Sequence, residues 1–239
     1  MKTSEQEIQM DISQLLTLSN KSTRVFFALF NRGIGVFLQF SLNILIGQLF
    51  GPAGMGIYHI YSTWMVILSD IASLGLPLYT MRKVSSLVQN LSKNNKIEIN
   101  ELIQHFLLLS IISSFLVTAV FITQPQVLSE VFLNSHQIAY VLVYAAIAAI
   151  IFLMIRILSE AIKALGYTNI GLLAESALLS LSLIISLFVL NLVADNYSIE
   201  HLLQIHLSTL LGVFLIIFYL TKQAIAKQTL LKKTSVTVA

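Results

Sequence analysis

The 239-residue chain is 56% hydrophobic and only 10% charged, with a mean hydropathy of +0.85. Soluble domains are about one quarter charged, so this composition favours a membrane protein. The absence of cysteine excludes disulfides, thiolate catalysis and cysteine-based zinc sites.

Six long apolar stretches follow one another along the chain. About 20 helical residues, at a rise of about 1.5 Å each, cross the roughly 30 Å hydrocarbon core of a bilayer. The stretches are continuous, whereas the strands of a β-barrel alternate with period two. The sequence therefore predicts an all-α integral membrane protein with one transmembrane lobe at 24–221. We expect its helices at 24–49, 56–80, 102–123, 138–162, 170–193 and 202–221.

The two ends of the chain are more polar than this lobe. Residues 1–23 carry apolar side chains at helical spacing, which is compatible with a helix on the membrane surface. A frayed cytoplasmic tail fits the same residues equally well. Residues 222–239 form a basic tail.

The loop charges predict the orientation. Lys and Arg occur in the N-terminal tail, in the 81–101 loop, at Lys163 and in the C-terminal tail, whereas the loops near 50–56, 124–137 and 194–201 contain neither. The positive-inside rule then places both termini in the cytoplasm, consistent with an even number of spans. Because the basic residues are divided among separate loops, no nucleic-acid partner is expected. They are Lys2, Lys21, Arg24, Arg82, Lys83, Lys93, Lys96, Lys163, Lys222, Lys227, Lys232 and Lys233.

Apart from the basic residues used for orientation, five Arg, Asp and Glu residues fall inside the predicted spans, and all lie in the cytoplasmic halves. Such residues are costly in lipid, so they face protein or a water-filled cavity and are candidates for function. Similar depth allows Arg32 to meet Asp70, and Arg156 to meet Glu175, with Glu160 one turn beyond Arg156.

A polar stripe on the first helix extends outward from Arg32. Arg32, Gly35, Gln39 and Asn43 lie within roughly 80° of one another at 100° per residue. The functional interpretation is a cavity open to the cytoplasm, in which Arg32, Gln39, Asn43 and Arg156 bind an anionic substrate, because arginine binds oxyanions in a bidentate way. Asp70, Glu160 and Glu175 are then counter-ions or ion-coupling groups. The structural alternative is that these charges are buried pairs that hold the bundle together.

No pattern in the chain indicates catalysis, a cofactor or a metal. There is no Gly-rich phosphate loop ending in Lys-Ser/Thr, no Gly-x-Ser-x-Gly elbow and no His-Glu-x-x-His motif. The five histidines have no metal-ligand spacing, and His201 and His206 are expected at the membrane interface without a special role. We therefore expect a protein that is not an enzyme.

Two segments carry a resemblance to a known family. LFGPAGMGIYHIYSTWMVILSDIASLGLPLYTMRKVSS contains Phe50-Gly51-Pro52 with Gly54, Gly56 and Tyr58, then Ser73-Leu74-Gly75-Leu76 before a basic loop, and ILSEAIKALGYTNIG contains a short Ala-Leu-Gly turn. These segments resemble the first helical hairpin and the fourth-to-fifth helix joint of bacterial polysaccharide flippases of O-antigen type. That family belongs to the multidrug/oligosaccharidyl-lipid/polysaccharide exporter superfamily.

The resemblance implies a multi-pass protein of the bacterial inner membrane. It would move an undecaprenyl-diphosphate-linked oligosaccharide to the outer leaflet by alternating access, with Arg32 and Arg156 as candidate contacts for the diphosphate. Family members have about twelve or more spans in two lobes, whereas six are predicted here. The resemblance therefore covers one lobe, and the other is expected from a second chain, a homodimer or a longer gene product.

Two other classes of function fit the same residues. A cation- or proton-coupled drug exporter of the same superfamily would use carboxylates in its interior, and this chain has both carboxylates and arginines there. A membrane scaffold or non-transporting fragment in a polysaccharide assembly complex would need none of these residues for transport.

Overall fold

The structure is a computed structural model that describes residues 2–89, 95–133, 139–175, 177–193 and 198–237. Within these ranges every regular element is an α-helix, so the predicted fold class is confirmed at the level of an all-helical protein. The helices are α1 (Lys2–Ser73), α2 (Leu76–Gln89), α3 (Asn95–Thr123), α4 (Pro125–Leu133), α5 (Ala139–Ala164), α6 (Thr168–Glu175), α7 (Ala177–Val193) and α8 (Ile199–Thr237).

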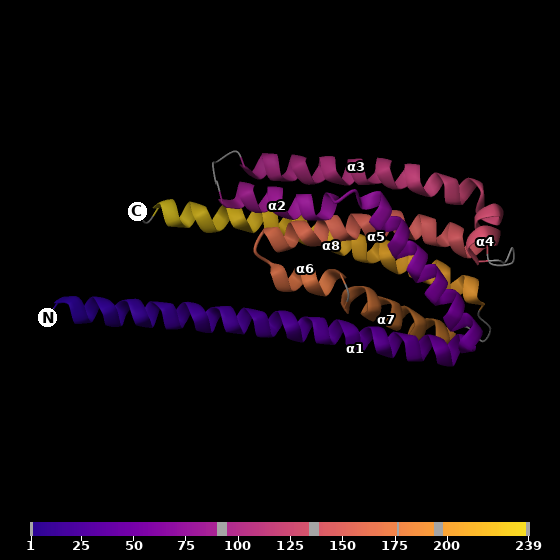
Figure 1. Ribbon diagram of the computed structural model, residues 1–239, viewed down its shortest axis with the longest axis horizontal. Coiled ribbons are helices and arrows are strands. Elements are labelled where there is room, and N and C mark those ends of the chain that lie inside the picture. Colours follow the sequence, from indigo (N-terminus) through magenta and orange to yellow (C-terminus); the bar gives the residue numbers. More distant parts are fainter. Residues whose placement is uncertain (1, 90–94, 134–138, 176, 194–197, 238–239) are drawn as a thin grey trace.

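Helix α1 is a hairpin of two arms and reverses direction at Gly51 (Figure 1). Gly51 has φ 70° and ψ −179°, a conformation that a residue without a Cβ adopts readily. Pro52 follows it and suits the first position of a new helix, where its missing N–H is not needed. The chain therefore turns where the sequence predicts a turn, although helix resumes at Pro52 and not at residue 56.

The second arm is shorter than predicted. It ends at Ser73, and both Leu74 (φ 47°) and Gly75 (φ 77°) take left-handed conformations before α2 begins. The predicted helix 56–80 is thus wrong beyond residue 73, because this turn separates its last residues into α2. The loops predicted at 81–101 and 124–137 also contain helix, since α2, α3 and α4 extend into them.

The remaining boundaries differ from prediction mainly at helix ends. Residues 2–23 are helical and continuous with the first arm of α1, and α8 continues to Thr237 through most of the predicted tail. The predicted fifth helix, 170–193, consists of α6 and α7, whose axes are bent by 44°. Several residues used for orientation lie wholly or by their side chains outside the described part: Lys2, Lys21, Arg24, Lys93, Lys96, Lys232 and Lys233.

Helix α5 forms the centre of the bundle. It packs against α1, α2, α3, α4, α6 and α8. Its Ala145, Ala149, Leu153 and Ile157 are at most 1% exposed. These buried apolar positions pack against the surrounding helices, and the small alanines allow close approach between neighbours.

Apolar side chains also cover much of the outer surface, including Leu108, Phe115 and Leu116 on α3 and Leu215 on α8. Four described segments are long and apolar enough to cross a bilayer: Leu29–Ser73, Ile97–Thr123, Ala139–Ala164 and Ile199–Lys227. The bent pair α6–α7 makes a fifth if it is counted as one span. By the length and composition of these helices, the chain is a multi-pass helical membrane protein. The segment Leu29–Ser73 contains the reversal at Gly51.

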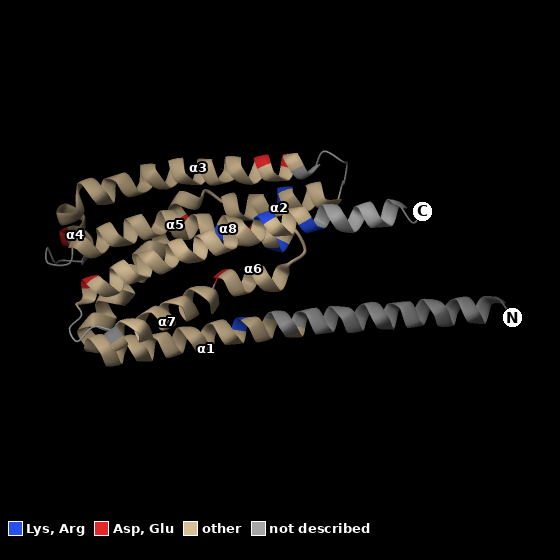
Figure 2. Ribbon diagram, turned by 180° about the vertical axis from the view of Figure 1, so that it is seen from behind, with Lys and Arg blue, Asp and Glu red and all other residues tan. Residues whose placement is uncertain are grey.

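Charge is distributed unequally between the two ends of the bundle (Figure 2). Arg82 and Lys83 on α2 and Lys222 and Lys227 on α8 lie at the end where α8 terminates, which we call the C-terminal end. The opposite end, where α4 lies, carries Glu130 and no Lys or Arg among the described residues.

Candidate functional site

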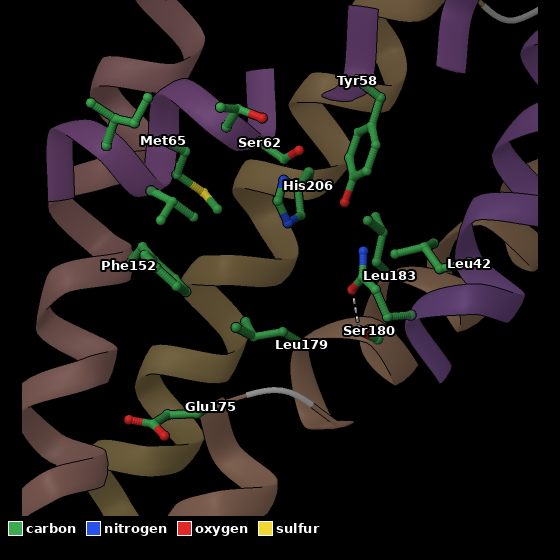
Figure 3. Close-up of a pocket in the computed structure, with 14 residues that line it drawn as sticks. Leu42, Tyr58, Ser62, Met65, Phe152, Glu175, Leu179, Ser180, Leu183 and His206 are labelled. Atoms are coloured by element: carbon green, nitrogen blue, oxygen red, sulfur yellow. Dashed lines mark hydrogen bonds between the residues drawn. The ribbon is translucent and has the colours of Figure 1, made fainter. Parts of the chain in front are cut away.

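A cavity of about 480 Å³ lies between the two arms of α1 and helices α5, α6, α7 and α8. Figure 3 shows its labelled side chains directed into this common space. Apolar side chains form much of its wall, and polar groups are set among them. The lining residues are Gln39, Leu42, Tyr58, Ser62, Thr63, Met65, Val66, Ile67, Phe152, Glu175, Leu179, Ser180, Leu183 and His206.

Gln39 is the member of the predicted polar stripe that reaches this cavity. Ser180 on α7 donates a hydrogen bond of 2.9 Å to Gln39 Oε1 (Figure 3). This bond joins the first arm of α1 to α7 and sets the orientation of the Gln39 amide, because its oxygen is the atom held by Ser180. The Gln39 amide nitrogen has no hydrogen bond within the described residues.

Tyr58 and His206, which both line the cavity, form a cluster with Tyr61 behind the wall. Tyr58 and Tyr61 come from the second arm of α1, and His206 comes from α8. The Tyr61 hydroxyl and His206 Nδ1 share a hydrogen bond of 2.9 Å, and the His206 ring lies 5.3 Å from the Tyr61 ring and 5.8 Å from the Tyr58 ring, centre to centre. All three side chains are buried. The cluster therefore fixes α8 against the hairpin beside the cavity.

The expectation for His206 was wrong. It was predicted to lie at the interface without a special role, but it is 6% exposed and lines the cavity. The signal available in the sequence was weak: Tyr58 and Tyr61 are three residues apart and share a helix face, but nothing in the pattern of α8 identifies His206 as their neighbour. His201, in contrast, lies exposed at the start of α8, where its Nδ1 is within 2.9 Å of Ser198 Oγ.

Arg156 pairs with Asp70, across α5 and the second arm of α1. Its guanidinium also lies 3.5 Å from the hydroxyl of Ser69 and 5.9 Å from the ring centre of Phe152, which lines the cavity. The predicted partners were different: Asp70 with Arg32, and Arg156 with Glu175. Neither predicted pair occurs among the described ion pairs, because similar depth does not by itself determine which side chains meet; the direction in which each helix faces does.

Glu175 and Glu160 instead share Lys163. Lys163 Nζ donates to Glu175 Oε2 at 2.7 Å and to Glu160 Oε1 at 3.0 Å, and its side chain is 10% exposed. Lys163 was predicted to lie in a loop, whereas it is the penultimate residue of α5. The bond to Glu175 connects the end of α5 to the end of α6, where the chain bends into α7, and the bond to Glu160 lies within α5.

Arg32 and Asn43, the other predicted binding residues, do not line the cavity. Arg32 is exposed on α1 and makes no hydrogen bond or ion pair with the described residues. Asn43 is partly buried, and its Oδ1 has no hydrogen-bond partner within the described part of the chain. The structure therefore gathers Gln39 and Glu175 at the cavity, places the Arg156–Asp70 pair beside it, and leaves Arg32 apart.

Comparison with known proteins finds no matching family model, curated protein or solved structure. The class of protein therefore follows from the fold and the site. The chain is a multi-pass α-helical membrane protein, with a partly polar cavity and a charged network beside it inside the apolar bundle.

Proposed function

We propose that the chain is one six-helix lobe of a transporter that moves a lipid-linked oligosaccharide across a bacterial inner membrane by alternating access. The observation that carries this proposal is the cavity of about 480 Å³ inside an apolar multi-pass bundle. Its wall combines polar and apolar side chains, as a site for an amphiphilic molecule requires. The resemblance of the α1 hairpin to polysaccharide flippases supports the same class of substrate.

Six spans result if the two arms of α1 cross the bilayer separately and α6–α7 crosses as one bent span. A single straight span of 45 residues would be about 68 Å long, roughly twice the hydrocarbon thickness. The basic C-terminal end of the bundle then faces the cytoplasm by the positive-inside rule. Both termini would be on that side.

The orientation can be tested directly because the chain contains no cysteine. Single cysteines at Ala53, Gln126 and Ser198 should react with a membrane-impermeant maleimide added outside intact cells. Cysteines at Ser86 and Gln223 should react only after the membrane is opened. Labelling of position 53 from the cytoplasmic side would contradict the proposed crossing of both α1 arms.

Arg32 is the proposed contact for the lipid diphosphate. It is an exposed cation within a candidate span, and it is not engaged by another described side chain. Lipid disfavours such a charge, so an anionic partner at this position would stabilise it. Asp70, whose side chain is 55% exposed, is similarly unsuited to lipid. The exposed surface around Arg32 and Asp70 is therefore proposed to meet a second lobe, which another copy of this chain or a different chain would supply.

The decisive experiment measures flipping of a lipid-linked oligosaccharide in proteoliposomes. We expect Arg32→Ala to reduce the rate by about tenfold or more, the loss of one charged contact. Arg82→Ala is the matched control, since Arg82 is an exposed arginine on α2 at the same end of the bundle. Equal rates for the two variants, or transport by crosslink-verified monomers, would contradict the proposal.

A cation-coupled drug exporter is a second candidate because of one observation. Glu175 is the single residue with a formal charge among the described residues that line the cavity. A carboxylate there suits a cationic substrate or a coupling ion. Export of a cationic dye that is abolished by Glu175→Gln, without oligosaccharide flipping, would favour this function. Normal protein levels with neither activity would favour a membrane scaffold.

A further inference from the structure

We propose that the cavity is a binding site for an uncharged, hydroxyl-bearing group, chemically a sugar ring, held by Tyr58, Gln39 and His206. The site would bind the carbohydrate part of an amphiphilic ligand and exclude its phosphate. This assignment deepens the proposed transport function and rests on it only for the identity of the whole substrate.

The Tyr58 hydroxyl is the first observation. The residue is 3% exposed, and its hydroxyl has no hydrogen bond within the described part of the chain. Figure 3 shows the hydroxyl directed into the cavity beside His206 and Leu183. The hydroxyl is not among the fully buried side-chain atoms that lack a partner, so it is open to the cavity and can bond a ligand atom that accepts or donates a hydrogen bond.

Gln39 and His206 are held in place by other bonds. Ser180 occupies Gln39 Oε1, which leaves the amide N–H groups as donors. Tyr61 occupies His206 Nδ1, which leaves Nε2 for the cavity side of the ring. Because these side chains are already oriented, a ligand would lose little side-chain entropy when it binds them.

The charge of the wall selects against an anion. Among the described lining residues there is no Lys or Arg, and the single formal charge is the Glu175 carboxylate. Lys163 already engages that carboxylate at 2.7 Å, which offsets its attraction for a cation. A neutral ligand is therefore favoured over both an oxyanion and a quaternary ammonium group.

The rest of the wall suits the shape of a sugar. Phe152, Leu179 and Leu183 provide apolar surface in the same wall as the hydrogen-bonding groups. A sugar ring presents hydroxyl groups at its edge and C–H groups on its faces, so it can contact both kinds of surface at once. A plain hydrocarbon chain would leave the Tyr58 hydroxyl unpaired.

The test compares three photoactivatable probes with the same octyl chain: a glucoside, a phosphate and a trimethylammonium. The full-length protein would be purified in an amine-oxide detergent, which has no sugar head group, and placed in nanodiscs. We expect the glucoside to label peptides that line the cavity. Tyr58→Phe should weaken this labelling by about fivefold, the effect of one lost hydrogen bond. Tyr79→Phe is the matched control, because Tyr79 is an exposed tyrosine outside the cavity.

Several results would overturn the assignment. They are stronger labelling of the cavity by the phosphate or the ammonium probe, no labelling of the cavity by the glucoside, and equal effects of the two tyrosine variants. Oligosaccharide flipping measured on the same preparation separates the two proposals. Flipping without glucoside labelling rejects the sugar site alone, whereas glucoside labelling without flipping rejects transport by this chain and its homodimer alone.

Discussion

At Gly171 helix α6 lies close against α5, and replacing this glycine with alanine tests that contact. A Cβ atom built at Gly171 would lie 2.5 Å from Lys163 Cγ and 2.8 Å from the backbone oxygen of Ser159. Ordinary contacts begin at 3.4 Å, so the Ser159 contact is too short by about 0.6 Å. Lys163 cannot easily move away because it is bonded to Glu160 and Glu175.

The expected cost follows from this geometry. Forcing an extra methyl group into a tight contact costs about 1–3 kcal/mol. Gly212→Ala is the matched control, because a Cβ at this position on α8 would meet no atom within 4 Å. Any gain in helix propensity is common to both variants. We therefore expect Gly171→Ala to be about 1–3 kcal/mol less stable than Gly212→Ala.

The assay is the free energy of unfolding in mixed micelles, titrated with dodecyl sulfate. In a Lys163→Ala background, which already lacks the ion pairs with Glu160 and Glu175, adding Gly171→Ala should cost less than it does in the wild type, because only the clash with the Ser159 backbone remains. Equal stability of Gly171→Ala and Gly212→Ala would refute the close packing of α6 on α5.

Three further predictions use the same unfolding titration or amide exchange. Arg156→Gln should destabilise the protein more than the double variant with Asp70→Asn, because it leaves an unpaired carboxylate; a double variant that is the less stable of the two would contradict this. A double-mutant cycle of Tyr61→Phe and His206→Phe should give a coupling of about 0.6 kcal/mol, typical of hydrogen bonds between membrane helices, and a coupling of zero would show that the bond contributes nothing. Lys163→Met should increase hydrogen–deuterium exchange in α6, because it removes the ion pair between Lys163 and Glu175 at the end of that helix. Unchanged exchange would show that this ion pair does not stabilise α6.

The charged residues inside the predicted spans could be located from the sequence, but their partners could not. Composition and residue order correctly located Arg156, Asp70, Glu160 and Glu175 within the helical bundle, because each interrupts an apolar stretch. Their partners could not be derived in the same way. A rise of 1.5 Å per residue gives depth, but partners also depend on how each helix is rotated about its axis, and packing against α5 determines that rotation.

The cavity was predictable only in part. The polar stripe on the first helix identified Gln39, while Tyr58 and His206 were missed because a tyrosine and a histidine in apolar helices have no distinctive spacing. They lie 148 positions apart in the chain numbering and become neighbours only when α8 packs against the α1 hairpin.

By itself, the sequence determined that the protein is helical, that it is suited to a membrane, and that it turns at Gly51-Pro52. These properties are local, since apolar length, a positive φ at glycine and the missing N–H of proline act within a few residues. The tertiary structure alone decided that Arg156 binds Asp70, that Lys163 joins Glu160 and Glu175, and that Tyr58, Gln39 and His206 share one cavity. Each of those results depends on which faces of distant helices meet, and side-chain packing around α5 determines those faces.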